Sequence, residues 1–105
     1  MRAETLKGHL DFLLLAALQR GPSHGYAVVE TLRARSGGSF DIPEGTIYPA
    51  LHRLERASLL TSRWSEESGR RRRTYRLTAR GQQALEKNQR EWRQFRGAVE
   101  AVAGA

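Results

Sequence analysis

The sequence predicts a mainly α-helical fold with one small β-hairpin, an α+β domain that continues into a long C-terminal helix. Three observations support this class. Leucines and other apolar residues recur at helical spacing in three segments before residue 58. Two short segments of β-prone residues follow between residues 59 and 77. A capped helical segment then ends the 105-residue chain, which has the size of a single domain.

The first helix is predicted over residues 5–19. Its leucines form a broad apolar face: Leu6, Leu10, Leu13, Leu14 and Leu18. Gly21 and Pro22 interrupt the helical pattern, so the helix should end before them.

The second helix is predicted over residues 24–35, with Ser23 as its N-cap. We expect its buried side to use three apolar residues, with two more at the margins: Tyr26, Val29 and Leu32, then Ala27 and Val28. The segment 36–39, rich in Gly and Ser, breaks the chain. Phe40 and Ile42 then alternate with a polar residue, which predicts either a very short strand or an extended connector.

The third helix is predicted from Pro43 or Glu44 to Ala57. Proline suits the first helical position, and glutamate suits the positive end of the helix dipole. Apolar residues at i, i+4 and i+7 form the inward stripe: Ile47, Leu51 and Leu54. Pro49 lies inside this helix and collides with the carbonyl of Gly45, whose backbone can adjust most easily. We therefore expect a tolerated kink.

A hairpin is predicted from two strands at residues 59–64 and 74–77. The segment 65–73 between them is polar and without periodicity, so the hairpin should have a long basic tip or a basic descending arm. Thr78 then caps a last helix over residues 79–103, which would be about 38 Å long.

The order of elements, three helices and a hairpin, is that of a winged helix-turn-helix domain. We assign residues 1–77 to such a DNA-binding domain and residues 78–105 to a C-terminal dimerisation helix. The third helix would enter the major groove and carry these DNA-contacting candidates: Thr46, Tyr48, Pro49, His52 and Arg53. Arg53 could pair with guanine or hold a phosphate, and Tyr48 could donate its hydroxyl to a phosphate. The alternative is that these are ordinary solvent-facing side chains.

The positive charge of the chain is concentrated in the hairpin. The net charge is +7, and residues 59–81 carry seven cations against two anions. Four cations are consecutive: Arg70, Arg71, Arg72 and Arg73. Such a run repels itself unless a polyanion is close, so we expect it to follow the DNA backbone or enter a minor groove. Because side chains alternate along a strand, two of the four should carry most of the contact. A solvated basic loop is the alternative.

The last helix carries an apolar seam with a seven-residue repeat. Its two positions are Leu85, Trp92 and Val99, and Asn88, Phe95 and Val102. A helix that extends beyond a small domain cannot bury this seam within its own chain, so we expect a two-fold partner and a homodimer. Trp92 has two interpretations: its ring is buried in the dimer core, or it is a platform on which flat aromatic ligands stack.

Several classes of function are excluded by composition. The chain has no Cys, which rules out disulfides, zinc–thiolate clusters and thiol nucleophiles. The longest apolar run, residues 12–18, is far too short for a membrane span, and no secretory signal is present. We therefore expect a cytoplasmic protein that does not associate with membranes. The three His are scattered, and no nucleophile–base pair or phosphate loop is present, so we predict no enzyme activity, metal or cofactor.

Three segments resemble the PadR family of transcriptional regulators. HLDFLLLAALQRGPSHGY (residues 9–26) resembles the opening of that family, and EGTIYPALHRLERASLL (residues 44–60) resembles its recognition-helix signature. RRRTYRLTARG (residues 71–81) resembles its wing strand and the entry into the last helix. The Gly-Thr-aliphatic-Tyr-Pro motif within residues 44–60 is the most specific of these matches.

The resemblance implies a homodimeric transcription factor, in most members a repressor, with a winged helix-turn-helix fold. The single C-terminal helix is similar to a compact subgroup, some members of which bind planar drugs at the dimer interface. Trp92 lies where such members carry a ligand-stacking Trp. Arg93 and Arg96 depart from those members, and favour an anionic or phenolic effector over a cationic drug. The resemblance also implies that residues 24–26 form a helix start packed against the core.

Together these observations predict a dimeric, sequence-specific regulator, a repressor that binds a palindromic operator in double-stranded DNA. A planar aromatic or phenolic ligand between the last helices would change the spacing of the two recognition helices and relieve repression. The alternative is a winged-helix adaptor that docks an acidic protein partner through its arginine-rich hairpin.

Overall fold

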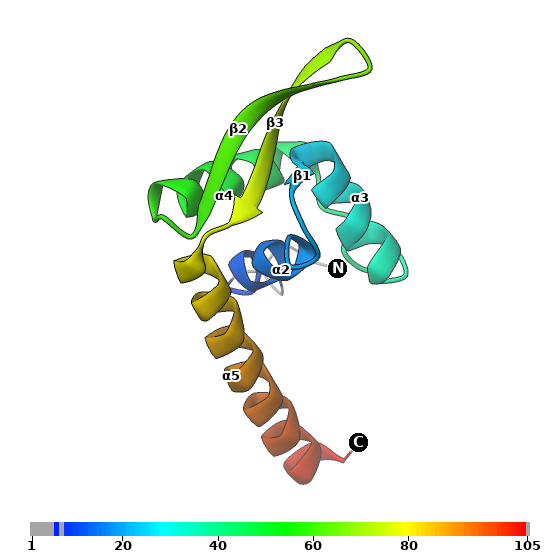
Figure 1. Ribbon diagram of the computed structural model, residues 1–105. Coiled ribbons are helices and arrows are strands. Elements are labelled where there is room, and N and C mark those ends of the chain that lie inside the picture. Colours follow the sequence, from blue (N-terminus) through cyan, green and yellow to red (C-terminus); the bar gives the residue numbers. More distant parts are fainter. Residues whose placement is uncertain (1–5, 7, 105) are drawn as a thin grey trace.

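A computed structural model describes Leu6 and residues 8–104, apart from the side chain of Glu67. The elements follow in this order: α2 (Leu10–Ala17), β1 (Ser23–His24), α3 (Gly25–Arg35), α4 (Glu44–Arg56), β2 (Leu60–Glu67), β3 (Arg70–Leu77) and α5 (Ala79–Ala103). Figure 1 shows the three shorter helices gathered together, with the β2–β3 hairpin projecting to one side and α5 leaving in the opposite direction. This arrangement confirms the predicted α+β class and the winged-helix order of elements.

The first described helix, α2, is shorter than the helix predicted over residues 5–19. Gly8 and His9 form a turn, and Gly8 has a φ of +86°, a left-handed backbone that ends any helix on its N-terminal side. At the other end Leu18 is the C-cap and is buried in the core. The predicted start, Thr5, lies outside the described residues.

The N-terminus of α3 differs from the prediction. Ser23 is not its N-cap: Ser23 and His24 form the two-residue strand β1, which pairs antiparallel with β3 and makes the sheet three-stranded in the order β1-β3-β2. His24 is the N-cap, and its Nδ1 accepts a hydrogen bond of 3.2 Å from the backbone N–H of Ala27. A two-residue strand has no periodicity, so sequence patterning could not show it.

The buried side of α3 is rotated from the one expected. Val28 and Leu32 are buried, whereas Tyr26 is 52% exposed and Val29 is half-buried. The cause is a close approach at Gly25, where an added Cβ would lie 2.3 Å from a ring carbon of Tyr48. The glycine thus occupies a core-facing position that a count of apolar residues overlooks.

Helix α4 follows the prediction closely. Ile47, Leu51 and Leu54 are 0–2% exposed, and Pro49 lies inside the helix. Pro43 is the N-cap, with extended backbone, and not the first helical residue. The segment before it forms no strand, and Ile42 is buried, so the extended connector is the correct alternative.

The hairpin is longer and more regular than predicted. β2 and β3 pair in register from Leu60 opposite Leu77 to Glu67 opposite Arg70. Only Ser68 and Gly69 form the turn, both with positive φ, as two-residue hairpin turns that match the strand twist require. The long basic tip is therefore wrong, and the basic descending arm is the correct alternative, because residues 70–73 belong to β3. Backbone pairing continues there although most of the side chains are solvated, so no apolar alternation marks the strands.

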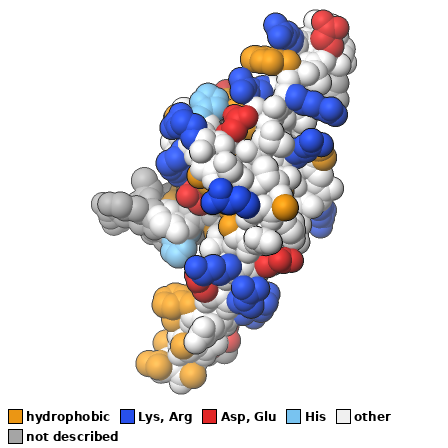
Figure 2. All heavy atoms as spheres, turned by 60° about the vertical axis from the view of Figure 1, so that its left-hand side comes forward, with side chains coloured by type: hydrophobic (Ala, Val, Ile, Leu, Met, Phe, Trp, Pro, Cys, Tyr) orange, Lys and Arg blue, Asp and Glu red, His pale blue; other side chains and the backbone are white. Residues whose placement is uncertain are grey.

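Helix α5 spans Ala79–Ala103 and begins as predicted, because the hydroxyl of Thr78 accepts a hydrogen bond of 3.0 Å from the N–H of Gly81. At Gly81 an added Cβ would lie 2.0 Å from the carbonyl oxygen of Leu59, so only glycine allows the helix to start against the hairpin. Figure 1 shows the far end of α5 projecting away from the other described elements, and Figure 2 shows hydrophobic side chains exposed there.

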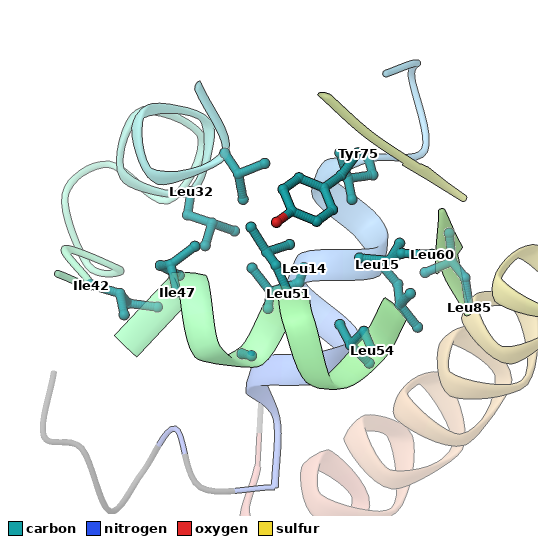
Figure 3. Packing of buried hydrophobic residues seen from close by; sticks show 13 residues of the cluster. Leu14, Leu15, Leu32, Ile42, Ile47, Leu51, Leu54, Leu60, Tyr75 and Leu85 are labelled. Atoms are coloured by element: carbon teal, nitrogen blue, oxygen red, sulfur yellow. The ribbon is translucent and has the colours of Figure 1, made fainter. Parts of the chain in front are cut away.

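The hydrophobic core lies between α2, α3, α4, the base of the sheet and the first turns of α5. Figure 3 shows Tyr75 of the sheet pointing toward Leu14 and Leu51, and Leu60 of the sheet beside Leu15. Leu85 of α5 enters the same cluster and is fully buried. One core therefore fixes α4 and the hairpin relative to each other.

Candidate functional site

The outward face of α4 is polar and solvent-exposed. The exposed residues include four of those predicted for DNA contact, and one further arginine: Thr46, Pro49, His52, Arg53 and Arg56. The inward stripe is buried, so this face cannot rotate into the core. The ring of His52 lies 6.4 Å from that of Tyr75, which places His52 on the side of α4 next to the hairpin.

Arg53 lies on the other side of α4. Its Nη2 forms an ion pair of 2.5 Å with Oδ1 of Asp11 in α2, and both side chains are about half exposed. An ion pair in water contributes little net free energy, so the guanidinium can exchange this carboxylate for another anion.

Tyr48, the remaining α4 candidate, is half-buried and closes the contact between α3 and α4 over Gly25. Burial raises the pKa of its hydroxyl, and the Glu44 carboxylate adds to the rise. The phenol therefore remains a neutral donor and acceptor at physiological pH.

The four consecutive arginines are divided between the two faces of the hairpin. Arg72 is half-buried, and its Nη1 lies 2.8 Å from Nε2 of His24. Arg71 and Arg73 point to the opposite face, where both guanidinium groups lie near the ring of Trp64. The expected alternation of the run is therefore present.

A network that the sequence did not indicate ties the hairpin to α4. The Nε of Arg73 donates a hydrogen bond of 2.7 Å to the hydroxyl of Ser62, and that hydroxyl donates one of 2.5 Å to Glu55. Nη2 of Arg73 also lies 3.6 Å from the other carboxylate oxygen of Glu55. Because Glu55 belongs to α4, the network fixes the base of the projecting arm against α4.

Trp64 is a second feature that sequence reasoning missed. Its side chain is 52% exposed, and the guanidinium carbons of Arg71 and Arg73 lie 4.8 and 5.6 Å from its ring centroid. Trp64 stands directly opposite Arg73 in the strand register. Only the register reveals this neighbourhood, and the register depends on the two-residue turn.

The outward face of α4 and the Trp64 face of the hairpin adjoin each other. We call them together the basic face: Arg53, Arg56, Trp64, Arg71 and Arg73. In Figure 2, Lys and Arg side chains spread over the hairpin and over the body of the molecule next to it. A convex helix beside a projecting basic arm is a shape that fits a groove and the adjacent backbone of duplex DNA.

The seam of α5 is largely solvent-exposed beyond its first turns. Asn88 is half-buried, whereas the later members are 42–91% exposed: Trp92, Phe95, Val99 and Val102. Leu85 is a correction to the predicted seam, because it is fully buried in the core of its own chain and offers no surface to a partner.

Next to this seam an open groove of about 530 Å³ lies between the start of α2 and α5. Its lining includes His9, Asp11, Phe12, Trp92 and Phe95. The rings of Trp92 and Phe95 are 6.3 Å apart, at an angle of 37°. Apolar rings and a carboxylate line the same groove, so it has the mixed character of a small-molecule site or of a covered interface.

Within residues 8–104 and Leu6, no group of three His, Asp or Glu side chains could hold a metal ion. None of the described helices combines the length and the apolarity that crossing a membrane requires.

Comparison with known proteins gives a consistent result. Residues 14–87 match the family described as "Transcriptional regulator PadR-like family". The chain is 36% identical over 84 residues to the transcriptional regulator YqjI of Escherichia coli, and this match covers 80% of the chain and 39% of that longer protein. It is 42% identical over 67 residues to the transcriptional regulator Rv3488 of Mycobacterium tuberculosis, which covers 64% of the chain and 60% of that protein.

Solved structures of similar shape belong to regulators as well. A transcriptional regulator from Clostridium thermocellum superimposes with a TM-score of 0.86, with 27% identity and 98% of each chain covered. A PadR family regulator from Clostridium difficile has a TM-score of 0.82, with 33% identity over 92% of this chain and all of that one. Bacillus subtilis PadR in complex with operator DNA has a TM-score of 0.69, with 25% identity over 76% of this chain and 46% of that one.

Proposed function

Because this chain belongs to the PadR-like family of transcriptional regulators, we propose that it is a dimeric repressor that binds a specific palindromic operator in double-stranded DNA. The basic face is the observation that carries this proposal. It joins the exposed polar face of α4 to a projecting arm that carries Arg71 and Arg73. The similarity to a PadR structure that contains operator DNA supports it.

In this function α4 lies in the major groove. Thr46, Pro49 and His52 face the base edges, and Arg53 releases Asp11 to take a guanine or a phosphate. Tyr48 meets the backbone at the edge of the groove. The hairpin extends along the flanking DNA, where Arg71 and Arg73 neutralise phosphates, while Arg70 and Arg72 add charge from the other face.

The dimer in this proposal forms through α5. Residues 1–77 are then the DNA-binding domain, and residues 78–105 form the dimerisation helix. The exposed apolar side chains of Trp92, Phe95 and Val99 need a cover, and a second copy supplies the same seam by two-fold symmetry. Two recognition helices about 34 Å apart would meet successive major grooves.

The effector in this proposal is a planar aromatic or phenolic molecule in the groove beside Trp92. A flat ring stacked on the indole, near Asn88 and Phe95, would change how the two α5 helices pack and hence the spacing of the α4 helices. Repression would be relieved when that spacing no longer matches the operator.

Selection of bound duplexes from a random DNA pool tests the function. We expect a palindromic sequence with half-sites one helical turn apart, bound far more tightly than random DNA at moderate salt. Retention without any sequence preference would contradict the proposal. It would favour the alternative that the arginine-rich hairpin docks an acidic protein partner.

Fluorescence titration with flat phenolic and cationic aromatic compounds tests the effector site. Wild-type protein is compared with the Trp92→Phe variant, because Trp64 also emits. Quenching that requires Trp92 and accompanies release of DNA supports the ligand platform. Equal signals from both proteins support Trp92 as dimer core only.

A further inference from the structure

The position of Trp64 is unusual for a large apolar side chain. It is more than half exposed on the outer part of the hairpin, residues 61–74, where the other side chains are polar or charged, and it lies away from both the core and the α5 seam. Exposing an indole ring forgoes the stabilisation that burial would give. The contacts of Trp64 on the neighbouring strand offer a reason for its exposed position.

Trp64 contacts two arginines of the neighbouring strand, Arg71 and Arg73. Both guanidinium groups lie within the range of about 6 Å over which a cation is attracted to an aromatic ring. Arg73 is also held by Ser62 and Glu55. For Arg71, the ring of Trp64 is the contact that orients it, since among the described side chains no acceptor takes a hydrogen bond from its guanidinium.

Stacking on a ring leaves a guanidinium able to bind anions. An aromatic ring attracts the cation without the paired oxygens of a carboxylate, so the fork of N–H bonds that grips a phosphate stays available. An ion pair with a carboxylate would occupy that fork. Trp64 can therefore hold Arg71 without competing with a phosphate, which Asp11 cannot do for Arg53.

We propose that Trp64 is a positioning residue of the wing, which holds the guanidinium group of Arg71 outward for the DNA backbone. This inference rests on the proposed function of DNA binding. An arginine side chain that is ordered before binding loses less conformational freedom when it meets a phosphate. The ring thus strengthens binding without adding a charge of its own.

The test compares Trp64 and Arg71 variants on two duplexes, one recovered by selection and one of random sequence and equal length. Arg71→Ala should weaken binding and lower the slope of log K against log salt by about 1, because one phosphate contact is lost. Trp64→Ala should weaken binding of both duplexes about three- to tenfold with an unchanged slope, because all charges remain.

A matched pair of substitutions isolates the aromatic face. Trp64→Phe keeps a ring and should retain most of the affinity, whereas Trp64→Leu keeps apolar bulk without a ring and should behave as Trp64→Ala. Equal affinity of the Phe and Leu variants would overturn the inference. Thermal unfolding of each variant separates a loss of the fold from a loss of positioning, since an exposed ring should hardly affect the midpoint.

A double-mutant cycle gives the decisive result. In the background Arg71→Ala with Arg73→Ala, removing Trp64 should no longer change the affinity, because no arginine is left to position. A Trp64→Ala effect of the same size in that background would show that the ring itself touches DNA, and would overturn the positioning role. If selection with wild-type protein recovered no duplex, the proposed function itself would fail, an outcome distinct from any result on Trp64.

Discussion

At the scale of single residues, Gly25 determines how α3 meets α4. Replacing it with Ala would place a Cβ 2.3 Å from the half-buried ring of Tyr48, so the ring or the helix must shift. We expect a loss of about 1–3 kcal/mol in the free energy of unfolding, measured by denaturant titration.

The matched control for Gly25 is Gly45, a glycine in the first turn of α4 where an added Cβ meets nothing within 4 Å. Gly45→Ala should leave the stability unchanged or raise it by up to about 1 kcal/mol. Similar losses from both substitutions would show that close packing at Tyr48 is not the cause.

Tyr75 makes the free energy of unfolding depend on pH in the alkaline range. Burial raises the pKa of its hydroxyl above the ordinary 10.0, because the tyrosinate anion is poorly solvated in the core. The unfolded chain therefore ionises first as the pH rises. The contribution of Tyr75 to stability is complete below pH 10 and is lost as the pH rises from 10 toward the folded-state pKa.

Tyr75→Phe should accordingly flatten the fall of the free energy of unfolding above pH 10. Denaturant titrations of the wild type and of Tyr75→Phe at a series of alkaline pH values measure this effect. A Tyr75→Phe curve that coincides with the wild-type curve would count against ionisation of this buried phenol.

At the scale of elements, how well each one could be predicted depends on how it is stabilised. α4 and α5 carry amphipathic stripes and recognisable ends, and their predicted boundaries lie within one residue of those observed. β1 and the outer hairpin are stabilised by backbone pairing and by partners distant in sequence, so no local pattern marks them. The same reason applies to the candidate site. The run of arginines can be recognised in the sequence, but the contacts of Trp64 and the link to Glu55 follow only from the register of β2 and β3.

The two residues of the hairpin turn lead to a further prediction. Ser68 and Gly69 have φ values of +52° and +75°, and Asn-Gly is the pair that such turns prefer. Ser68→Asn should therefore stabilise the arm and slow hydrogen exchange of the β2 and β3 amides beside the turn. Gly69→Ala should speed that exchange, because a side chain at positive φ costs about 1 kcal/mol. Exchange rates that respond to neither change would show that the turn does not limit opening of the arm.

At the scale of the whole molecule, the shape itself argues for a partner. The radius of gyration is 14.8 Å, whereas a compact chain of this length would have about 13 Å, and the longest extent is 53 Å. The excess arises because α5 runs past the core after Leu85. The apolar stripe of α5 is buried at its start and exposed at its end. Substitutions at the two ends should therefore have different effects.

Substitutions at Leu85 and in the distal seam distinguish an effect on folding from an effect on dimer assembly. Leu85→Ala removes a fully buried side chain and should cost about 2–5 kcal/mol of folding free energy. Phe95→Asp with Val99→Asp should leave the fold intact, because both residues are exposed in the single chain. It should convert a micromolar dimer into a monomer in sedimentation equilibrium and weaken binding to a two-half-site operator. If the wild-type protein were a monomer at that concentration, α5 would not be a dimer interface. The protein would then have no two-fold symmetry with which to recognise a palindrome.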